Sequence, residues 1–197
     1  MNQSLISPLA KIGKNVKIGY CAHIYASAII EDDCNIGDYC VVGHPSAGPS
    51  ANKPVRIGCG ALIRSHTVIY EGSNLDQGLE TGHHVVIREG TIAGRNLRIG
   101  NNSDIEGDCY IGDFCRFHGY VHVGRGSKIG HFVRLYSLVT LANDPLPPSN
   151  IVSPVTIEDA VVVCIGSTIM PGSILKCGAF ISAHSVVSGE IPSGAVV

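Results

Sequence analysis

Nine histidines stand out in a chain of 197 residues in which Asp, Glu, Lys and Arg together make up only 15%. Imidazole changes its charge near neutral pH, so a histidine can remove the proton from an attacking amine or hydroxyl group. Three of the nine lie in one short region, at His66, His83 and His84. These residue types favour general-base chemistry in that part of the chain.

A six-residue periodicity organises the elements that must position these histidines. Aliphatic residues recur at every sixth position in three uninterrupted runs, which start at residues 6, 57 and 157. Of the 28 hexads in these runs, 25 begin with Ile, Leu or Val, and only Thr81, Ala93 and Phe117 depart. The fifth place of the hexad is usually small. This period fits neither an α-helix nor a simple strand.

Short strands joined by tight corners satisfy the six-residue period. Three hexads then form one triangular coil of about 18 residues, with the large residue inside and the small one near the corner. Glycine after the aliphatic residue relieves backbone crowding at the bend. Residues 18 apart lie on consecutive coils, which places His66 and His84 at one corner. His83 follows Gly82 and is expected to point outward.

The eight cysteines follow from the same repeat. Cys34, Cys40, Cys109 and Cys115 occupy the small inward place of their hexads, where cysteine acts as a compact hydrophobic residue. No Cys-x-x-Cys occurs, and the other four cysteines have no obvious partner. We therefore expect eight free thiols rather than a disulfide framework.

Two interruptions of the repeat predict loops. The first covers about residues 43–54 and the second about 142–155, and both are rich in Pro, Ser and Asn. Counting hexads in threes places both loops at the same edge of the prism, about five coils apart. Loops on a rigid scaffold often carry binding groups, so these two are candidates.

The hexad pattern, over nearly the whole chain, resembles the hexapeptide-repeat acyltransferase family. The resemblance implies an all-β fold, a left-handed parallel β-helix of about nine triangular coils with two loop excursions. Residues 1–197 are expected to form a single domain. The family further implies a homotrimer with its sites in clefts between subunits, and a second loop that reaches a neighbouring subunit.

The segment Gly82-His-His-Val-Val-Ile-Arg-Glu89 is similar to a motif of the family's subgroup that acetylates sugars, often nucleotide-linked amino sugars. That resemblance implies an enzyme, an acetyltransferase, with His83 as the catalytic base. Glu89 or Asn143 would orient His83, and Asp144 would hold the acceptor's ammonium or hydroxyl group. Residues expected to contact the acceptor are His66, His84, Arg88, Asn143 and Asp144.

Two C-terminal segments, residues 163–172 and 178–187, look like the coils that line the family's coenzyme A groove. The resemblance implies acetyl-coenzyme A as acyl donor, with Gly166, Ser167 and Ala183 at the coenzyme. The partners expected are this donor and a sugar or nucleotide-sugar acceptor. No metal is expected.

Two other functions stay open. The gamma-class carbonic anhydrases share this β-helix and bind zinc through three histidines at a trimer interface, which here would be His118 and His122 with His83, His84 or His131. However, His118 and His122 are four residues apart, whereas that class spaces its paired histidines by five. The other alternative is a non-catalytic β-helix that serves as a scaffold.

Composition excludes other classes of function. The formal net charge of −2 leaves no basic footprint for nucleic acid. No apolar run approaches the ~18 residues of a membrane-spanning helix. The first residues lack the basic and apolar regions of a signal peptide, so we expect a cytoplasmic protein.

Overall fold

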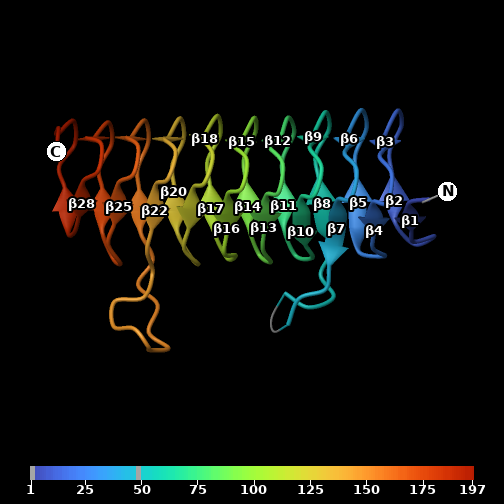
Figure 1. The fold of residues 1–197 in the computed structure, drawn as a ribbon, viewed down its shortest axis with the longest axis horizontal. Coiled ribbons are helices and arrows are strands. Elements are labelled where there is room, and N and C mark those ends of the chain that lie inside the picture. The colour runs from blue at the N-terminus through green and yellow to red at the C-terminus, as the bar shows by residue number, and fades with distance from the viewer. Residues whose placement is uncertain (1–2, 48–49) are drawn as a thin grey trace.

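The computed structural model describes residues 3–47 and 50–197, so residues 1–2 and two residues of the first predicted loop lie outside the described part. In these ranges the chain forms 29 short strands and no helix. The strands stack as parallel coils into a long solenoid, with the N-terminus at one end and the C-terminus at the other (Figure 1). No segment of the described chain is therefore a helix that could cross a membrane.

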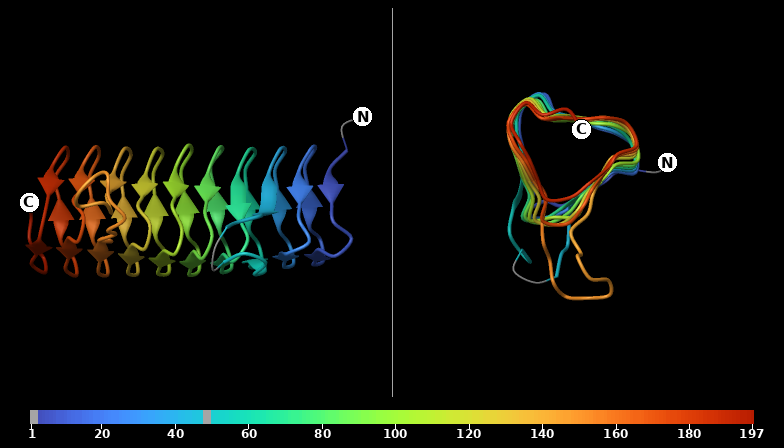
Figure 2. Two further views of the ribbon diagram at one scale, coloured as in Figure 1. Left: turned by 90° about the horizontal axis from the view of Figure 1, so that it is seen from below. Right: turned by 90° about the vertical axis from the view of Figure 1, so that its left-hand side faces the viewer.

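Three parallel sheets form the walls of the solenoid, which is triangular in cross-section (Figure 2). Sheet A contains β1 (Leu5–Ile6), β4 (His23–Ile24), β7 (Val41–His44), β10 (Val68–Tyr70), β13 (Val86–Ile87), β16 (Asp104–Ile105), β19 (His122–Val123), β22 (Thr140–Leu141), β25 (Thr168–Ile169) and β28 (Val186–Val187).

The next strand of each coil belongs to sheet B and the last to sheet C. Sheet B contains β2 (Lys11–Ile12), β5 (Ala28–Ile30), β8 (Val55–Ile57), β11 (Asn74–Leu75), β14 (Ile92–Ala93), β17 (Tyr110–Ile111), β20 (Lys128–Ile129), β23 (Thr156–Ile157), β26 (Ile174–Leu175) and β29 (Glu190–Ile191). Sheet C contains β3 (Lys17–Ile18), β6 (Asn35–Ile36), β9 (Leu62–Ile63), β12 (Glu80–Thr81), β15 (Arg98–Ile99), β18 (Arg116–Phe117), β21 (Arg134–Leu135), β24 (Val162–Val163) and β27 (Phe180–Ile181).

The predicted fold class, an all-β parallel β-helix of hexapeptide repeats, is confirmed. Strand partners lie 18 residues apart wherever no loop intervenes, as in Val86↔Asp104 and Asp104↔His122. The solenoid has about ten coils, in agreement with the prediction of about nine, and contains one strand more than the 28 predicted hexads. The additional strand is β29, in which Ile191 follows Val187 after four residues rather than six.

Aliphatic side chains fill the interior of the prism. The first residue of each hexad from Ile24 to Val187 is buried, including the three that depart from the aliphatic rule, Thr81, Ala93 and Phe117. The hydroxyl oxygen of Thr81 accepts a hydrogen bond from the Arg64 amide at 3.1 Å, which explains how a polar residue is tolerated there. Each coil can bury these inward side chains only against the coils on either side of it, so its stability depends on its neighbours.

The cysteines match the prediction. Cys34, Cys40, Cys109 and Cys115 are buried, and all eight thiols are free. Burial raises the pKa of Cys109 and that of Cys115 to about 11, because a thiolate is poorly solvated inside the prism. These four residues are therefore part of the core.

Both loop excursions leave the corner between sheets A and B, which we call the AB corner (Figure 2). The first loop joins β7 to β8 and the second joins β22 to β23, and five strand pairings separate β7 from β22. The predicted common edge and spacing of the loops thus agree with the structure.

Candidate active site

The region around His83 lies at the corner between sheets C and A, the CA corner. His66 and His84 stack there with ring centroids 4.6 Å apart, as the 18-residue spacing predicts. Both residues have positive φ, 63° and 56°, a conformation in which His, Asn and Asp are enriched. The backbone at this corner is therefore a sufficient reason for histidine at positions 66 and 84.

His83 itself is exposed and borders a groove of about 580 Å³ on the outside of sheet C. Its Nδ1 lies 2.8 Å from the hydroxyl oxygen of Ser65, and its amide donates to the Asn101 side chain at 2.8 Å. A Cβ at Gly82 would collide with Asn101, so glycine is needed for this close packing. No carboxylate of the described residues forms a hydrogen bond with the His83 ring.

The residues predicted to orient His83 lie elsewhere. Glu89 is 3% exposed and sits at the AB corner, where Arg88 donates two hydrogen bonds to it, at 2.9 and 3.1 Å. The guanidinium of Arg125 lies 3.8 Å from Glu89. Glu89 is thus a buried anion held by two cations, and the structure does not bring it to His83.

The second loop holds the other predicted residues. The Asp144 carboxylate accepts hydrogen bonds from the Leu146 amide and the Ser149 hydroxyl, at 2.9 and 3.0 Å, and so fixes the start of the loop. The amide group of Asn143 donates to Glu106 at 3.5 Å. Asn143 therefore belongs to a group of residues on sheet A, away from His83.

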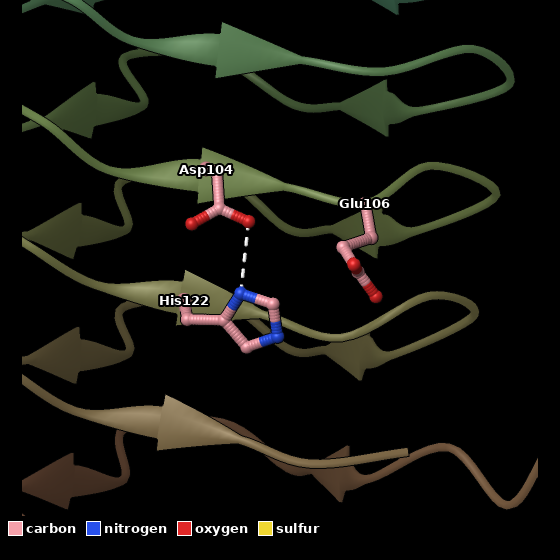
Figure 3. Close-up of side chains that lie close together, drawn as sticks. All are labelled: Asp104, Glu106 and His122. Carbon is pink, nitrogen blue, oxygen red and sulfur yellow. Dashed lines mark hydrogen bonds and ion pairs between the residues drawn. The ribbon is translucent and has the colours of Figure 1, made fainter. Parts of the chain in front are cut away.

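A histidine–carboxylate pair lies at the centre of that group. His122 on β19 and Asp104 on β16 face outward from consecutive coils, and His122 Nδ1 is 2.8 Å from Asp104 Oδ2 (Figure 3). An ionised carboxylate can only accept, so Nδ1 carries a proton, and in the neutral ring the lone pair of Nε2 is free. This is the arrangement in which a histidine acts as a general base.

The environment sets the protonation of His122. The hydrogen bond to Asp104 raises the pKa of His122, with a further contribution from the Glu106 charge, while partial burial opposes the rise. Glu106 also accepts a hydrogen bond from the Arg125 amide at 3.4 Å. We call Asp104, Glu106, His122 and Asn143 the His122 site.

The His122 site is also the place in the described chain where a metal ion could be held. One ligand atom from each of Asp104, Glu106 and His122 lies within 4.8 Å of the others. This set has one imidazole and two carboxylates, whereas the zinc alternative needs three histidines. His118 stacks instead on Tyr136 and His131 Nδ1 accepts from the Asp113 amide, so one chain does not assemble that histidine set.

The predicted coenzyme residues lie at the CA corner of the C-terminal coils. Gly166 has a φ of 69° and packs against the His184 ring, and Ala183 is exposed. Ser167 is buried, and its hydroxyl donates to the Ser182 carbonyl at 2.8 Å inside the prism. The Ser167 side chain is therefore part of the core, and contact with a coenzyme stays a prediction for Gly166 and Ala183.

Comparison with known proteins gives consistent results. Residues 9–44 match the family described as bacterial transferase hexapeptide (six repeats). The bifunctional protein GlmU of Acetivibrio thermocellus is 28% identical over 181 residues, which are 92% of this chain and 37% of that protein. The acyl-[acyl-carrier-protein]–UDP-N-acetylglucosamine O-acyltransferase of Bartonella quintana is 29% identical over 132 residues, covering 64% of this chain and 43% of that one.

The chain thus spans well under half the length of these curated relatives. Among solved structures, the UDP-N-acetylglucosamine acyltransferase of Arabidopsis superposes with a TM-score of 0.72 at 22% identity, over 96% of this chain and 67% of that one. This likeness concerns the fold. Residues 9–44 thus match the repeat of bacterial hexapeptide transferases, and the hexad periodicity and stacked triangular coils extend that similarity over the described chain.

Proposed function

We propose that this chain is an acyltransferase that moves an acetyl group from acetyl-coenzyme A to an amino or hydroxyl group of a sugar, in particular a nucleotide-linked amino sugar. The hydrogen bond between His122 and Asp104 is the observation that carries the proposal, because it supplies an oriented base on an open face. The B. quintana relative is named for acyl transfer to a nucleotide-linked sugar, which supports the acceptor class.

The chemistry at the His122 site follows from its geometry. Nε2 removes the proton from the acceptor's amine or hydroxyl group as that group attacks the thioester carbonyl carbon. A C–N or C–O bond forms, the C–S bond breaks, and the departing thiolate takes up the proton from the imidazolium. Asp104 holds the ring in one tautomer and stabilises its charged form.

His83 was predicted as the base and stays a second candidate for that role. It borders the groove on sheet C, but its ring nitrogen is hydrogen-bonded to a serine hydroxyl rather than to a carboxylate. A neutral hydroxyl stabilises the imidazolium less than an ionised carboxylate does. The geometry therefore favours His122, and both residues belong in the same mutagenesis experiment.

The proposal is tested by thiol release. Acetyl-coenzyme A and an acyl-loaded carrier protein are offered in turn as donors with a panel of nucleotide-linked sugars that carry a free amine or hydroxyl group. We expect thiol release that depends on the acceptor and is greater with acetyl-coenzyme A than with the acyl-loaded carrier protein. No thiol release with any donor or acceptor, together with no binding of coenzyme A, would favour the scaffold alternative.

A chelator separates the metal alternative from base catalysis. Dialysis against a chelator is expected to leave thiol release unchanged, because His122 needs no metal to act as a base. Loss of activity that zinc restores would assign the reaction to a metal at Asp104, Glu106 and His122 instead.

A further inference from the structure

Three arginines form a column on the outer face of sheet C. Arg98 on β15, Arg116 on β18 and Arg134 on β21 are direct register partners on consecutive coils. Their Cα atoms are thus separated by the strand spacing of about 4.8 Å. All three side chains are exposed. We call these residues the arginine column.

The charge of this column is poorly balanced. Arg98 lies 3.4 Å from Glu80, but Glu80 is shared with Arg64, whose guanidinium is 3.0 Å away. Within residues 3–47 and 50–197, no carboxylate lies within 4.0 Å of the guanidinium of Arg116 or Arg134. Like charges directly opposite on neighbouring strands are destabilising, so the column has an electrostatic cost that a bound anion would remove.

His118 shows that the positive field reaches the CA corner. Partial burial lowers the pKa of His118, and the charges of Arg116 and Arg134 lower it further. His118 also stacks on Tyr136, with ring centroids 4.5 Å apart. An aromatic surface therefore lies next to the cationic column.

The groove that His83 borders runs along this surface. Its lining includes Arg64, Arg98 and Arg116 together with His118 and Tyr120, while Arg134 lies on the next coil, outside the lining. Asn101 and Asn102 add amide groups to its wall. Guanidinium groups bind phosphate through paired N–H donors, and aromatic rings stack on bases. Both properties suit a nucleoside diphosphate.

We propose that Arg98, Arg116 and Arg134 form a binding site for a diphosphate group. Each phosphoryl unit contacts two neighbouring guanidinium groups, so Arg116 contacts both units. The physiological source rests on the proposed function, since both a nucleotide-linked sugar and coenzyme A carry a diphosphate. Only four residues separate His118 from His122, a span of at most about 14 Å. The arginine column on sheet C and the His122 site on sheet A thus lie on adjacent walls of the prism, on either side of the CA corner.

Inorganic pyrophosphate is the probe for this site. Its binding is measured by calorimetry with the wild-type chain, with the double variant Arg116→Gln/Arg134→Gln, and with Arg56→Gln as a matched control. Arg56, on β8 of sheet B, is a partly exposed arginine, but it pairs with Glu31. We expect the double variant to bind at least about tenfold more weakly and the control to bind like wild type.

Competition identifies the source of the diphosphate. A nucleoside diphosphate that displaces pyrophosphate better than coenzyme A does would assign the column to the acceptor, and the reverse order would assign it to the donor. Absence of pyrophosphate binding to the wild-type chain, or equal binding by the double variant with an unchanged melting temperature, would overturn the proposal. Because the assay needs no acyl transfer, its outcome is independent of the proposed activity.

Discussion

The ring of His122 is hydrogen-bonded to a carboxylate, whereas the nearest carboxylate to the His131 ring, that of Asp113, is 3.9 Å away. His66 and His84 stack on one another at a corner that favours left-handed backbone, and His131 Nδ1 accepts a backbone amide. His122 is held by a carboxylate on the neighbouring coil. An imidazole with an ionised partner at Nδ1 and a free Nε2 is suited to proton transfer, whereas the other three are explained by local structure.

Two buried thiols predict how stability depends on pH. The folded chain retains the protons of Cys109 and Cys115 up to about pH 11, whereas in the unfolded chain they are lost near the ordinary value of 9.0. Their contribution to the free energy of unfolding is therefore complete below pH 9 and falls as the pH rises towards 11. Urea unfolding measured between about pH 8 and about pH 10.5 is expected to show this decline.

The double variant Cys109→Ala/Cys115→Ala provides the control for that measurement. It loses packing at every pH, but its unfolding free energy should decline less steeply over the same range, since two of the buried thiols are gone. Equal slopes for the two proteins would show that these thiols do not stay protonated in the folded chain.

The sequence could have revealed more of the site than it did. Asp104 and His122 are 18 residues apart, the same spacing that correctly paired His66 with His84. Applying that spacing to each histidine would have found the pair. The link between Asn143 and Glu106 could not be predicted in this way, because it depends on how the second loop returns to the prism. The arginine column follows from spacing alone, but the lack of carboxylates beside it does not.

At the scale of the elements, one carboxylate binds two backbone amides in the described part of the first loop. Glu71 is 6% exposed, and its Oε1 accepts hydrogen bonds from the Ser46 and Asn52 amides at 3.0 and 2.9 Å. Hydrogen bonds to a charged acceptor are stronger than neutral ones. The loop therefore has a defined position relative to sheet A at both of these residues.

Weakening that attachment should loosen the loop without unfolding the coils. In Glu71→Gln, the amide hydrogens of Ser46 and Asn52 are expected to exchange about tenfold faster, because a neutral amide oxygen accepts more weakly. Hydrogen exchange followed by NMR measures this directly. The Leu146 amide, which Asp144 binds in the second loop, is the internal control. Unchanged protection of Ser46 and Asn52 would mean that other contacts hold the loop.

The strands and corners were predictable because each hexad repeats the same arrangement of residue types. An inward aliphatic residue, a small residue and a corner residue recur, so the register of one coil fixes the next. The interior of the two loops was not predictable, since their polar side chains bind particular backbone amides. Glu71 and Asp144 gave no periodic signal of that role.

At the scale of the whole molecule, the prism explains the composition. A narrow triangular interior has no place for tryptophan, of which the chain has none, and its walls need little charge. Each coil is covered only by its neighbours, so the N-terminal coil is left open, with Leu5, Ile6 and Ile12 exposed. Stability is then a property of the stack rather than of any single coil.

The resemblance to hexapeptide-repeat transferases implies a homotrimer, and the His122 site is open enough to take a second wall. The side chains of His122 and Asp104 are 35% and 44% exposed, so one chain provides only one wall of the site. We expect a homotrimer in which a neighbouring chain supplies the other wall. Sedimentation at micromolar concentration should give the mass of three chains, and a monomer with full transferase activity would contradict a shared site.

The most direct test of the account compares the rates of acyl transfer of the wild-type chain, His122→Ala and His83→Ala under identical conditions. If His122 is the base, His122→Ala should lose about 10²-fold or more of the wild-type rate. His83→Ala should retain most of it. The wild-type rate should also rise with pH as His122 loses its proton, and that dependence should shift to lower pH in Asp104→Asn, because the carboxylate raises the pKa of His122. A near-native rate for His122→Ala in a folded protein would contradict the account, and a large loss for His83→Ala alone would transfer the role to His83.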